Sequence, residues 1–189
     1  MKELQEKILK DGIILNNNII KVDAFINHQI DVKLINRFAN KVKEHFNEER
    51  IDKVLTIEAS GIAIAYAVAE AFDCIPLVFA KKSKSQIVDD NVYKSEIKSF
   101  TRNINSLVTV SKNYLHKDER ILIVDDFLAE GNAAMGLIDI CEQAGAKVVG
   151  FTAAVEKQFQ GGSKRILEKG IKVYCGAIIK SFENNKPTF

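Results

Sequence analysis

The chain has 189 residues, 47% hydrophobic and 28% charged, a composition that excludes general disorder and fibrous repeats. This length suffices for one sizeable core and is short for two ordinary domains, so we expect a single domain over residues 1–189. The 27 Lys and Arg nearly balance the 25 Asp and Glu, and the net charge of +2 argues against a nucleic-acid or membrane partner.

The first quarter of the chain is predicted to contain two helices separated by short extended runs. Leu4 and Ile8 lie on one face of the first helix, which Gly12 should end. Apolar residues that recur every four positions predict the second helix. Residues 24–31 are too mixed to assign. The predicted elements are a helix over 1–10, extended runs over 13–15 and 19–22 around an Asn-rich turn, and a helix over 34–46.

The next segment changes pattern, from helical periodicity to short apolar runs that alternate with helices. A β-branched run, Lys53 to Ile57, precedes a Ser-Gly turn and an Ala-rich helix over 62–72. A further strand is predicted over 75–80. This alternation is typical of a parallel sheet with helices on both faces.

Residues 81–120 are polar and interrupt this alternation. We expect a flexible loop and a hairpin over about 81–115, with candidate strands at 96–101 and 106–112. A polar insertion of this size in a compact domain is usually functional, and we interpret it as a lid.

A second strand, loop and helix unit follows from residue 120. The wholly apolar run Ile121 to Val124 is typical of a central parallel strand. A helical stripe from Ala133 to Ala144 should end at Gly145, and a strand is predicted over 148–155. The remaining elements are a helix near 163–169, a strand over 172–178 and a polar end.

The cysteines and the first residues indicate the compartment. Three widely spaced cysteines, Cys74, Cys141 and Cys175, form no C-x-x-C pair and cannot all pair within one chain, which favours a reducing cytosol. The opening MKELQEKILKDG lacks the apolar core of a secretory signal, and no later run is long enough to cross a bilayer. We therefore expect a cytoplasmic protein.

Two adjacent acids, Asp125 and Asp126, end the predicted central strand. Open α/β sheets bind ligands at this end of their strands. A core position would impose a large desolvation cost on a carboxylate, so we expect the pair to serve a site instead. Carboxylates there suit sugar hydroxyls and hydrated Mg²⁺.

The loop after the acids has the features of a phosphate site. Ala129, Glu130, Gly131, Asn132 and Ala133 lead into a helix, whose first backbone N–H groups attract anions. Gly131 allows close approach of the backbone. Acids for a diol or metal, followed within one turn by a phosphate site, match the span of a ribose 5-phosphate.

This arrangement resembles the motif of type I phosphoribosyltransferases that binds phosphoribosyl pyrophosphate (PRPP). Their motif usually has Thr before the Gly and Thr or Ser two residues after it, where this chain has Glu130 and Ala133. We expect the Glu130 side chain to point away from the phosphate. Bacterial xanthine phosphoribosyltransferases also lack the Thr pair. The chain is similar to them in KVDAFINHQID (21–31), TIEASGIA (56–63), VFAKK (78–82), DDFLAEGNAAMGL (125–137) and EKQF (156–159).

The resemblance implies the type I phosphoribosyltransferase fold, an α/β fold whose central parallel sheet is flanked by helices, with a base-binding hood at about 1–31. It also implies residue roles. Asp125 and Asp126 would be catalytic; Ala129, Glu130, Gly131, Asn132 and Ala133 would bind PRPP; Glu58, Ala59, Ser60, Gly61 and Lys81, with Lys82, would meet the pyrophosphate; and Ile20, Asn27 and Lys157 would contact the purine.

The implied reaction transfers the phosphoribosyl group of PRPP to xanthine in a homodimeric enzyme. Mg²⁺ would be the cofactor, bound through PRPP near the two acids and without direct protein ligands. A cation at Lys157 can hold a purine oxo oxygen, and the Asn27 amide can contact a second edge. Xanthine, with two oxo groups, suits such donors. No residue is required as a general base.

Other functions remain open at this stage. The enzyme could use hypoxanthine, guanine or adenine, or the chain could be a PRPP-sensing regulatory protein, although such regulators usually add a basic DNA-binding module. A receiver domain is disfavoured because its paired acids open the domain. Asp125 and Asp126 could also be a solvated strand end, and Lys157 a solvated lysine.

Overall fold

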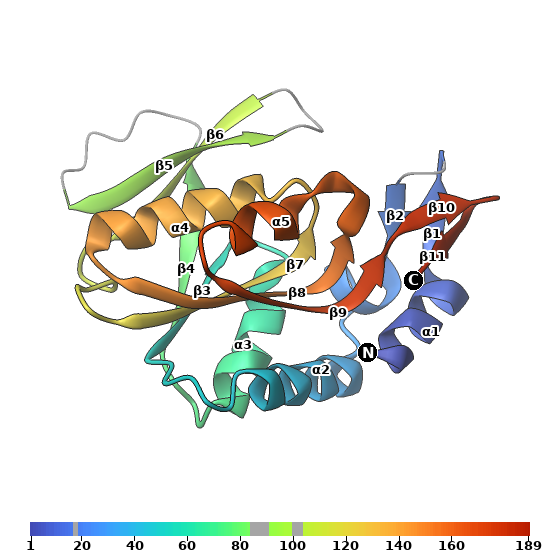
Figure 1. Cartoon of the computed structure of the whole chain (residues 1–189), viewed down its shortest axis with the longest axis horizontal. Helices are drawn as coiled ribbons and strands as arrows, with labels where there is room; N and C mark the ends of the chain where they lie inside the picture. Colours follow the sequence, from blue (N-terminus) through green and yellow to red (C-terminus); the bar gives the residue numbers. More distant parts are fainter. Residues whose placement is uncertain (17–18, 84–90, 100–103) are drawn as a thin grey trace.

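A seven-stranded sheet forms the centre of the computed structural model, which describes residues 1–16, 19–83, 91–99 and 104–189 (Figure 1). Its order is β5-β6-β4-β3-β7-β8-β9. Five neighbouring strands are parallel, and β5 and β6 continue the sheet in antiparallel pairing. The strands are β3 (Lys53–Ile57), β4 (Leu77–Ser83), β5 (Val92–Ser99), β6 (Ile104–Ser111), β7 (Arg120–Leu128), β8 (Lys147–Lys157) and β9 (Lys172–Ile179).

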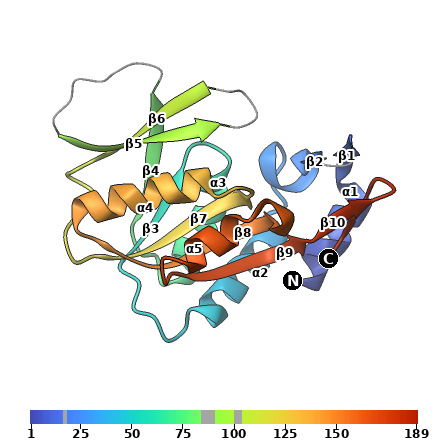
Figure 2. The same cartoon turned by 45° about the horizontal axis from the view of Figure 1, so that its top comes forward.

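Helices cover both faces of this sheet, as the alternating pattern predicted (Figure 2). On one face lie α1 (Lys2–Asp11), α2 (Val32–His45) and α3 (Gly61–Ala71), and on the other lie α4 (Asn132–Ala144) and α5 (Gly162–Leu167). Each face has its own apolar core. Phe25, Phe38 and Phe46 are fully buried in the first core, and Phe151 is buried in the second.

Local sequence signals explain where these helices begin and end. The Asp31 carboxylate accepts the Leu34 N–H at 3.1 Å and so caps α2. The predicted stop of α4 at Gly145 is confirmed, because this glycine has the left-handed φ of +69° that a helix C-cap uses.

The hairpin in the polar insertion differs in its bounds from the prediction. β5 begins at Val92, four residues earlier than expected, because β5 and β6 pair from Val92↔Ser111 to Ser99↔Ile104, beyond their apolar residues. Lys81 and Lys82 belong to β4 and precede any loop. The predicted flexible segment falls on residues 84–90, which lie outside the described residues.

Small elements from both ends of the chain gather at one side of the sheet (Figure 1). β1 (Ile13–Leu15) pairs with β2 (Ile19–Lys21), and a π-helix spans the unassigned segment at Asp23–Asn27. The tail, predicted only as a polar end, forms a hairpin of β10 (Ser181–Glu183) and β11 (Lys186–Thr188). Asn184 and Asn185 have positive φ, which suits a two-residue hairpin turn.

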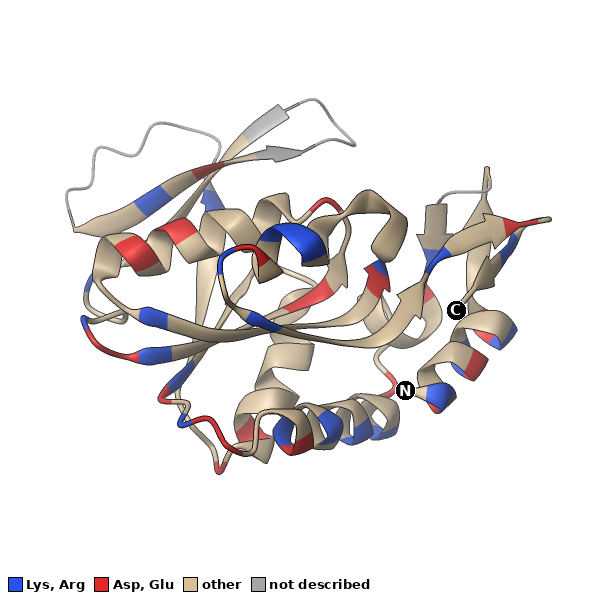
Figure 3. Ribbon diagram, in the orientation of Figure 1, with Lys and Arg blue, Asp and Glu red and all other residues tan. Residues whose placement is uncertain are grey.

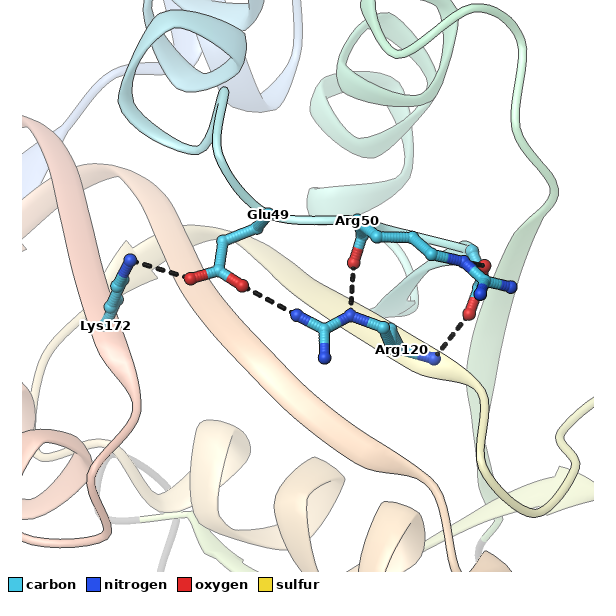
Figure 4. A network of polar contacts seen from close by, with 5 residues as sticks. Glu49, Arg50, Arg120 and Lys172 are labelled. Atoms are coloured by element: carbon cyan, nitrogen blue, oxygen red, sulfur yellow. Dashed lines mark hydrogen bonds and ion pairs between the residues drawn. The ribbon is translucent and has the colours of Figure 1, made fainter.

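A network of charges closes the opposite edge of the sheet, where the parallel strands begin (Figure 4). The Glu49 carboxylate accepts from Arg120 and from Lys172, both at 2.7 Å. The Arg120 side chain also donates to the Arg50 carbonyl at 2.7 Å, and its backbone N–H donates to Asp52 at 3.0 Å. These contacts hold together the starts of β3, β7 and β9.

The helices of the described ranges are all too short or too polar to span a bilayer. In Figure 3 charged residues are frequent along α1 and α2, whereas most of the central sheet is tan.

Candidate functional site

The two acids lie within β7, which continues through them to Leu128. They nevertheless lie beyond the part of β7 that pairs with the neighbouring strand β3, because that pairing stops at Leu55↔Ile123. Asp125 is only 6% exposed, so the expectation that a core position would be avoided is wrong for this residue. Asp126 is half-buried.

Burial has a large electrostatic effect on Asp125. It raises the pKa of this carboxyl well above the ordinary 3.8, and the Asp126 carboxylate raises it further. The Asp126 N–H, which donates to Asp125 Oδ1 at 2.9 Å, and the Lys82 charge lower the pKa of Asp125 by less. A positive charge placed beside this pair is therefore stabilised in a desolvated setting.

The loop after β7 turns sharply into α4. Gly131 has a φ of +80°, a left-handed conformation that suits glycine, and stands at the N-cap of the helix. The Glu130 side chain folds back on the loop and accepts from Asn132 Nδ2 at 3.2 Å. Ala129 and Ala133 are half-buried beside it. The first turn of α4 has backbone N–H groups without intrahelical partners, the type of group that binds anions in proteins.

The second predicted loop lies directly against the acids. A Cβ on Gly61 would be 2.4 Å from Thr56 Oγ1 and 3.3 Å from Asp125 Oδ1, so only glycine fits here. The peptide bond between Glu58 and Ala59 is cis. Ser60 is the N-cap of α3, which adds a second helix N-terminus to the site.

The lysines after this loop are placed by β4. Lys81 and Lys82 are exposed, and the Lys82 backbone N–H donates to the Glu58 carboxylate. The Glu58 carboxylate therefore fixes the loop to β4. Gly61 of the same loop lies beside Asp125, on the strand that leads into the other predicted anion loop. Both loops therefore lie at the same edge of the sheet.

A cavity of about 360 Å³ extends from the second loop toward the small N-terminal elements. It joins Asn27, predicted as a base contact, to Ala59 and Ser60 of the predicted pyrophosphate loop. The lining residues are Ile26, Asn27, Ile30, Ala59, Ser60 and Ala63.

The two other predicted base contacts do not line this cavity. Ile20 is 7% exposed and packs in the core of the first face. Lys157 ends β8, two residues beyond the predicted strand, and is half-buried. Desolvation lowers the pKa of Lys157, so its ammonium favours a polar or anionic partner more than an exposed lysine does.

The structure gives contacts for two residues to which the sequence analysis assigned no role. Phe159 packs edge-on against Phe182 of β10, with ring centroids 5.9 Å apart, and only the EKQF run had drawn attention to it. Arg165 of α5 donates to the Glu130 carbonyl and to Asn132 Oδ1. Nothing in the sequence pointed to Arg165, because its partners lie more than thirty residues away along the chain.

Comparison with known proteins agrees with this geometry. The model of the phosphoribosyl transferase domain family matches residues 21–184. The xanthine phosphoribosyltransferase of Clostridium tetani is 49% identical over 189 residues, which cover all of both chains. Xanthine phosphoribosyltransferase 2 of Clostridium botulinum is 50% identical over the same span.

Solved structures show the same fold at lower identity. An adenine phosphoribosyltransferase from Rhodothermus marinus superposes with a TM-score of 0.74 at 20% identity, over 95% of this chain and all of that one. The enzyme of Trypanosoma brucei in complex with AMP, pyrophosphate and ribose-5-phosphate gives 0.77 at 14% identity, over 97% and 82% of the two chains. Both are type I phosphoribosyltransferase folds, as the sequence predicted.

Proposed function

Since the chain belongs to the phosphoribosyl transferase domain family, we propose that it transfers the phosphoribosyl group of PRPP to xanthine, giving xanthosine 5'-monophosphate and pyrophosphate in purine salvage. One observation supports this most directly: buried Asp125 lies against Gly61 of one anion loop and on the strand that leads into the other. A sugar with a phosphate at each side fits between two helix N-termini.

Different parts of the site bind different groups of PRPP. The loop from Ala129 to Ala133 binds the 5-phosphate at the start of α4, and the loop from Glu58 to Gly61 binds the pyrophosphate at the start of α3. Asp125 and Asp126 face the ribose hydroxyls between the loops. Their negative charge stabilises the positive charge that develops on the ribose ring as the C1–oxygen bond to pyrophosphate breaks and a purine nitrogen attacks C1.

The donor set also fits Mg²⁺ bound mainly through PRPP. Within the described ranges, no three His, Cys, Asp or Glu side chains are grouped to hold a metal. Mg²⁺ takes oxygen ligands and keeps several waters, so PRPP oxygens and water would complete its shell near Asp125 and Asp126 without direct protein ligands. When bound, the ion would neutralise the leaving pyrophosphate.

The base is expected in the cavity beside Asn27, with Lys157 as a second polar contact. A purine with oxo groups accepts hydrogen bonds from the Asn27 amide and the Lys157 ammonium. Ile20 supports this side of the site from the core. The resemblance further supports a cytoplasmic homodimer, to which the exposed Tyr66 (64%) and Phe79 (40%) could contribute apolar contact area.

The direct test incubates purified protein with PRPP, Mg²⁺ and one nucleobase at a time, and measures pyrophosphate and nucleotide. Xanthine should be consumed with the highest kcat/KM. Preference for hypoxanthine, guanine or adenine would contradict the substrate assignment. PRPP binding without turnover of any base would contradict the enzymatic role and favour a sensor. Sedimentation equilibrium tests the dimer.

A further inference from the structure

Helix α5 is packed onto the loop that precedes α4. The Gly162 N–H donates to the Ala129 carbonyl at 3.0 Å. A Cβ on Gly162 would lie 2.4 Å from that same carbonyl oxygen, and a Cβ on Gly131 would lie 3.2 Å from the Gly162 Cα. Two glycines thus allow the backbone of α5 to approach the loop more closely than side chains would permit.

Arg165 contacts the same loop with its side chain. Its Nη1 donates to the Glu130 carbonyl at 2.5 Å and to Asn132 Oδ1 at 2.8 Å. One guanidinium group therefore holds the backbone of one loop residue and the side chain of another. Hydrogen bonds from a charged donor are stronger than neutral ones.

The Arg165 contact determines which end of the Asn132 amide is available as a donor. A guanidinium group can only donate, so the atom that faces it must be the amide oxygen, and the NH₂ end points the other way. In the structure Asn132 Nδ2 donates to the Glu130 carboxylate at 3.2 Å. An anion is thus already the partner of this NH₂ group.

A phosphate dianion only accepts hydrogen bonds, so the loop must supply donors. Threonine hydroxyls, which the common form of the motif has at two positions, are replaced here by Glu130 and Ala133. We propose that Arg165 is a positioning residue for the 5-phosphate of PRPP. It fixes the loop backbone and orients the Asn132 NH₂ group toward an anionic partner. This NH₂ group takes the place of the missing hydroxyl donors. This inference rests on the proposed function.

The test compares Arg165→Ala with Lys164→Ala, a matched control that removes an exposed cation from the same helix. Calorimetry measures the Kd of ribose 5-phosphate and of pyrophosphate, and kinetics give the KM of PRPP and of xanthine. Arg165→Ala should raise the Kd of ribose 5-phosphate and the KM of PRPP about tenfold, the effect of losing a charged hydrogen bond. The pyrophosphate Kd and the xanthine KM should stay within about twofold.

Two further variants separate positioning from general loop support. Arg165→Lys keeps a cationic donor and should recover part of the ribose 5-phosphate affinity. In the double variant Arg165→Ala with Asn132→Ala, the loss should be smaller than the product of the two single losses, because both act through one contact. Thermal melting verifies that each variant is folded. If Arg165→Ala does not fold, Arg165→Lys is compared with Lys164→Ala instead.

Several outcomes would overturn the inference. Unchanged ribose 5-phosphate affinity in folded Arg165→Ala would remove the positioning role, and equal losses for ribose 5-phosphate and pyrophosphate would indicate a structural role only. Failure of the proposed function would appear differently, as absence of xanthine turnover by the unaltered protein. The ribose 5-phosphate measurement distinguishes the two, because it does not require turnover.

Discussion

Charged residues are arranged differently at the two edges of the parallel sheet, the edge where its strands begin and the edge where they end. Where the strands begin, Glu49 is paired with Arg120 and Lys172, and Lys53 is paired with Glu119 at 2.6 Å. Where they end, two acids of the same sign stand side by side at Asp125 and Asp126. The first edge satisfies its charges within the protein, whereas at the second edge the Lys82 charge offsets only part of the effect of burial and of Asp126 on Asp125.

Buried polar atoms follow the same division. In the described part of the chain, three buried side-chain oxygens make no hydrogen bond, and they belong to Thr56, Thr152 and Glu156. Thr56 and Glu156 each stand one residue before the end of their strand. Buried polar groups normally have a hydrogen-bond partner, and these oxygens of Thr56 and Glu156 have none in the described part of the protein, at the edge where the acids lie.

The largest expected effect comes from removing both carboxylates at the ligand edge. Replacement of Asp125 and Asp126 by Asn should lower kcat by about 1,000-fold, because preorganised charge at the reacting ring is lost. Steady-state kinetics with PRPP and xanthine measure this, and circular dichroism should show an intact fold. A double variant that turns over at the normal rate would show that the two edges do not differ in function.

A smaller effect is expected from the contact between the pyrophosphate loop and Asp125. Gly61→Ala would place a Cβ 2.4 Å from Thr56 Oγ1, so the pyrophosphate loop must shift away from Asp125. A displacement of about 1 Å can cost roughly 100-fold in kcat/KM, which should appear for PRPP. Gly170→Ala is the control: its φ is +74° and nothing lies within 4 Å, so it should cost stability and leave kcat/KM unchanged.

A substitution at the predicted base contact Lys157 should have a smaller effect, and mainly on the KM of xanthine. Lys157→Ala should raise the KM of xanthine about tenfold, because one charged donor is lost, and change the KM of PRPP little. Its lowered pKa adds a pH effect: the ammonium loses its proton below the ordinary 10.5, so the xanthine KM of the unaltered protein should rise at a lower pH than that value. Equal changes in both KM values would contradict a base contact.

The smallest expected effect is on the free energy of unfolding, and it compares Glu49 at one edge with Asp125 at the other. Hydrogen bonding to Lys172 lowers the pKa of Glu49 below 4.5, so this carboxylate stabilises the fold above that pH and ceases to do so as pH falls. The raised pKa of Asp125 has the opposite sign: its ionisation destabilises the fold as pH rises above 3.8. Near neutral pH, Glu49→Gln should lower and Asp125→Asn should raise the unfolding free energy by about 1 kcal/mol.

Thermal melts from neutral pH down to about pH 2 measure both variants. Each should approach the unaltered protein at the acid end, where both carboxyl groups are protonated in the folded and unfolded states. A stability loss in Asp125→Asn at neutral pH would mean that its carboxylate is already balanced within the protein. The charge division between the edges would then be wrong.

The sequence predicted the sheet, the helices on its two faces and the order of the two loops, because these depend on local periodicity and turn residues. It failed where distant segments meet. The burial of Asp125 depends partly on contact with Gly61, and the placement of Asn132 depends on Arg165. The strand bounds also moved, since β8 extends to Lys157 by pairing with β9 as far as Ile179.

The C-terminal hairpin was missed for a different reason. Its polar residues suggest a loose end, and only the Asn-Asn pair at 184–185 is a turn signal. The hairpin is held by tertiary packing, because Phe182 and Phe189 lie against the core of the first face. Such packing cannot be recognised from six alternating residues without the surface they cover.

The contact between Phe159 and Phe182 has a practical consequence for spectroscopy. The chain contains no tryptophan, and Phe159 is 48% exposed two residues beyond Lys157. Phe159→Trp would therefore introduce the only indole in the protein at the junction between β8 and the C-terminal hairpin. Its emission depends on the water around the ring, so xanthine and PRPP binding could be followed by fluorescence without an added label.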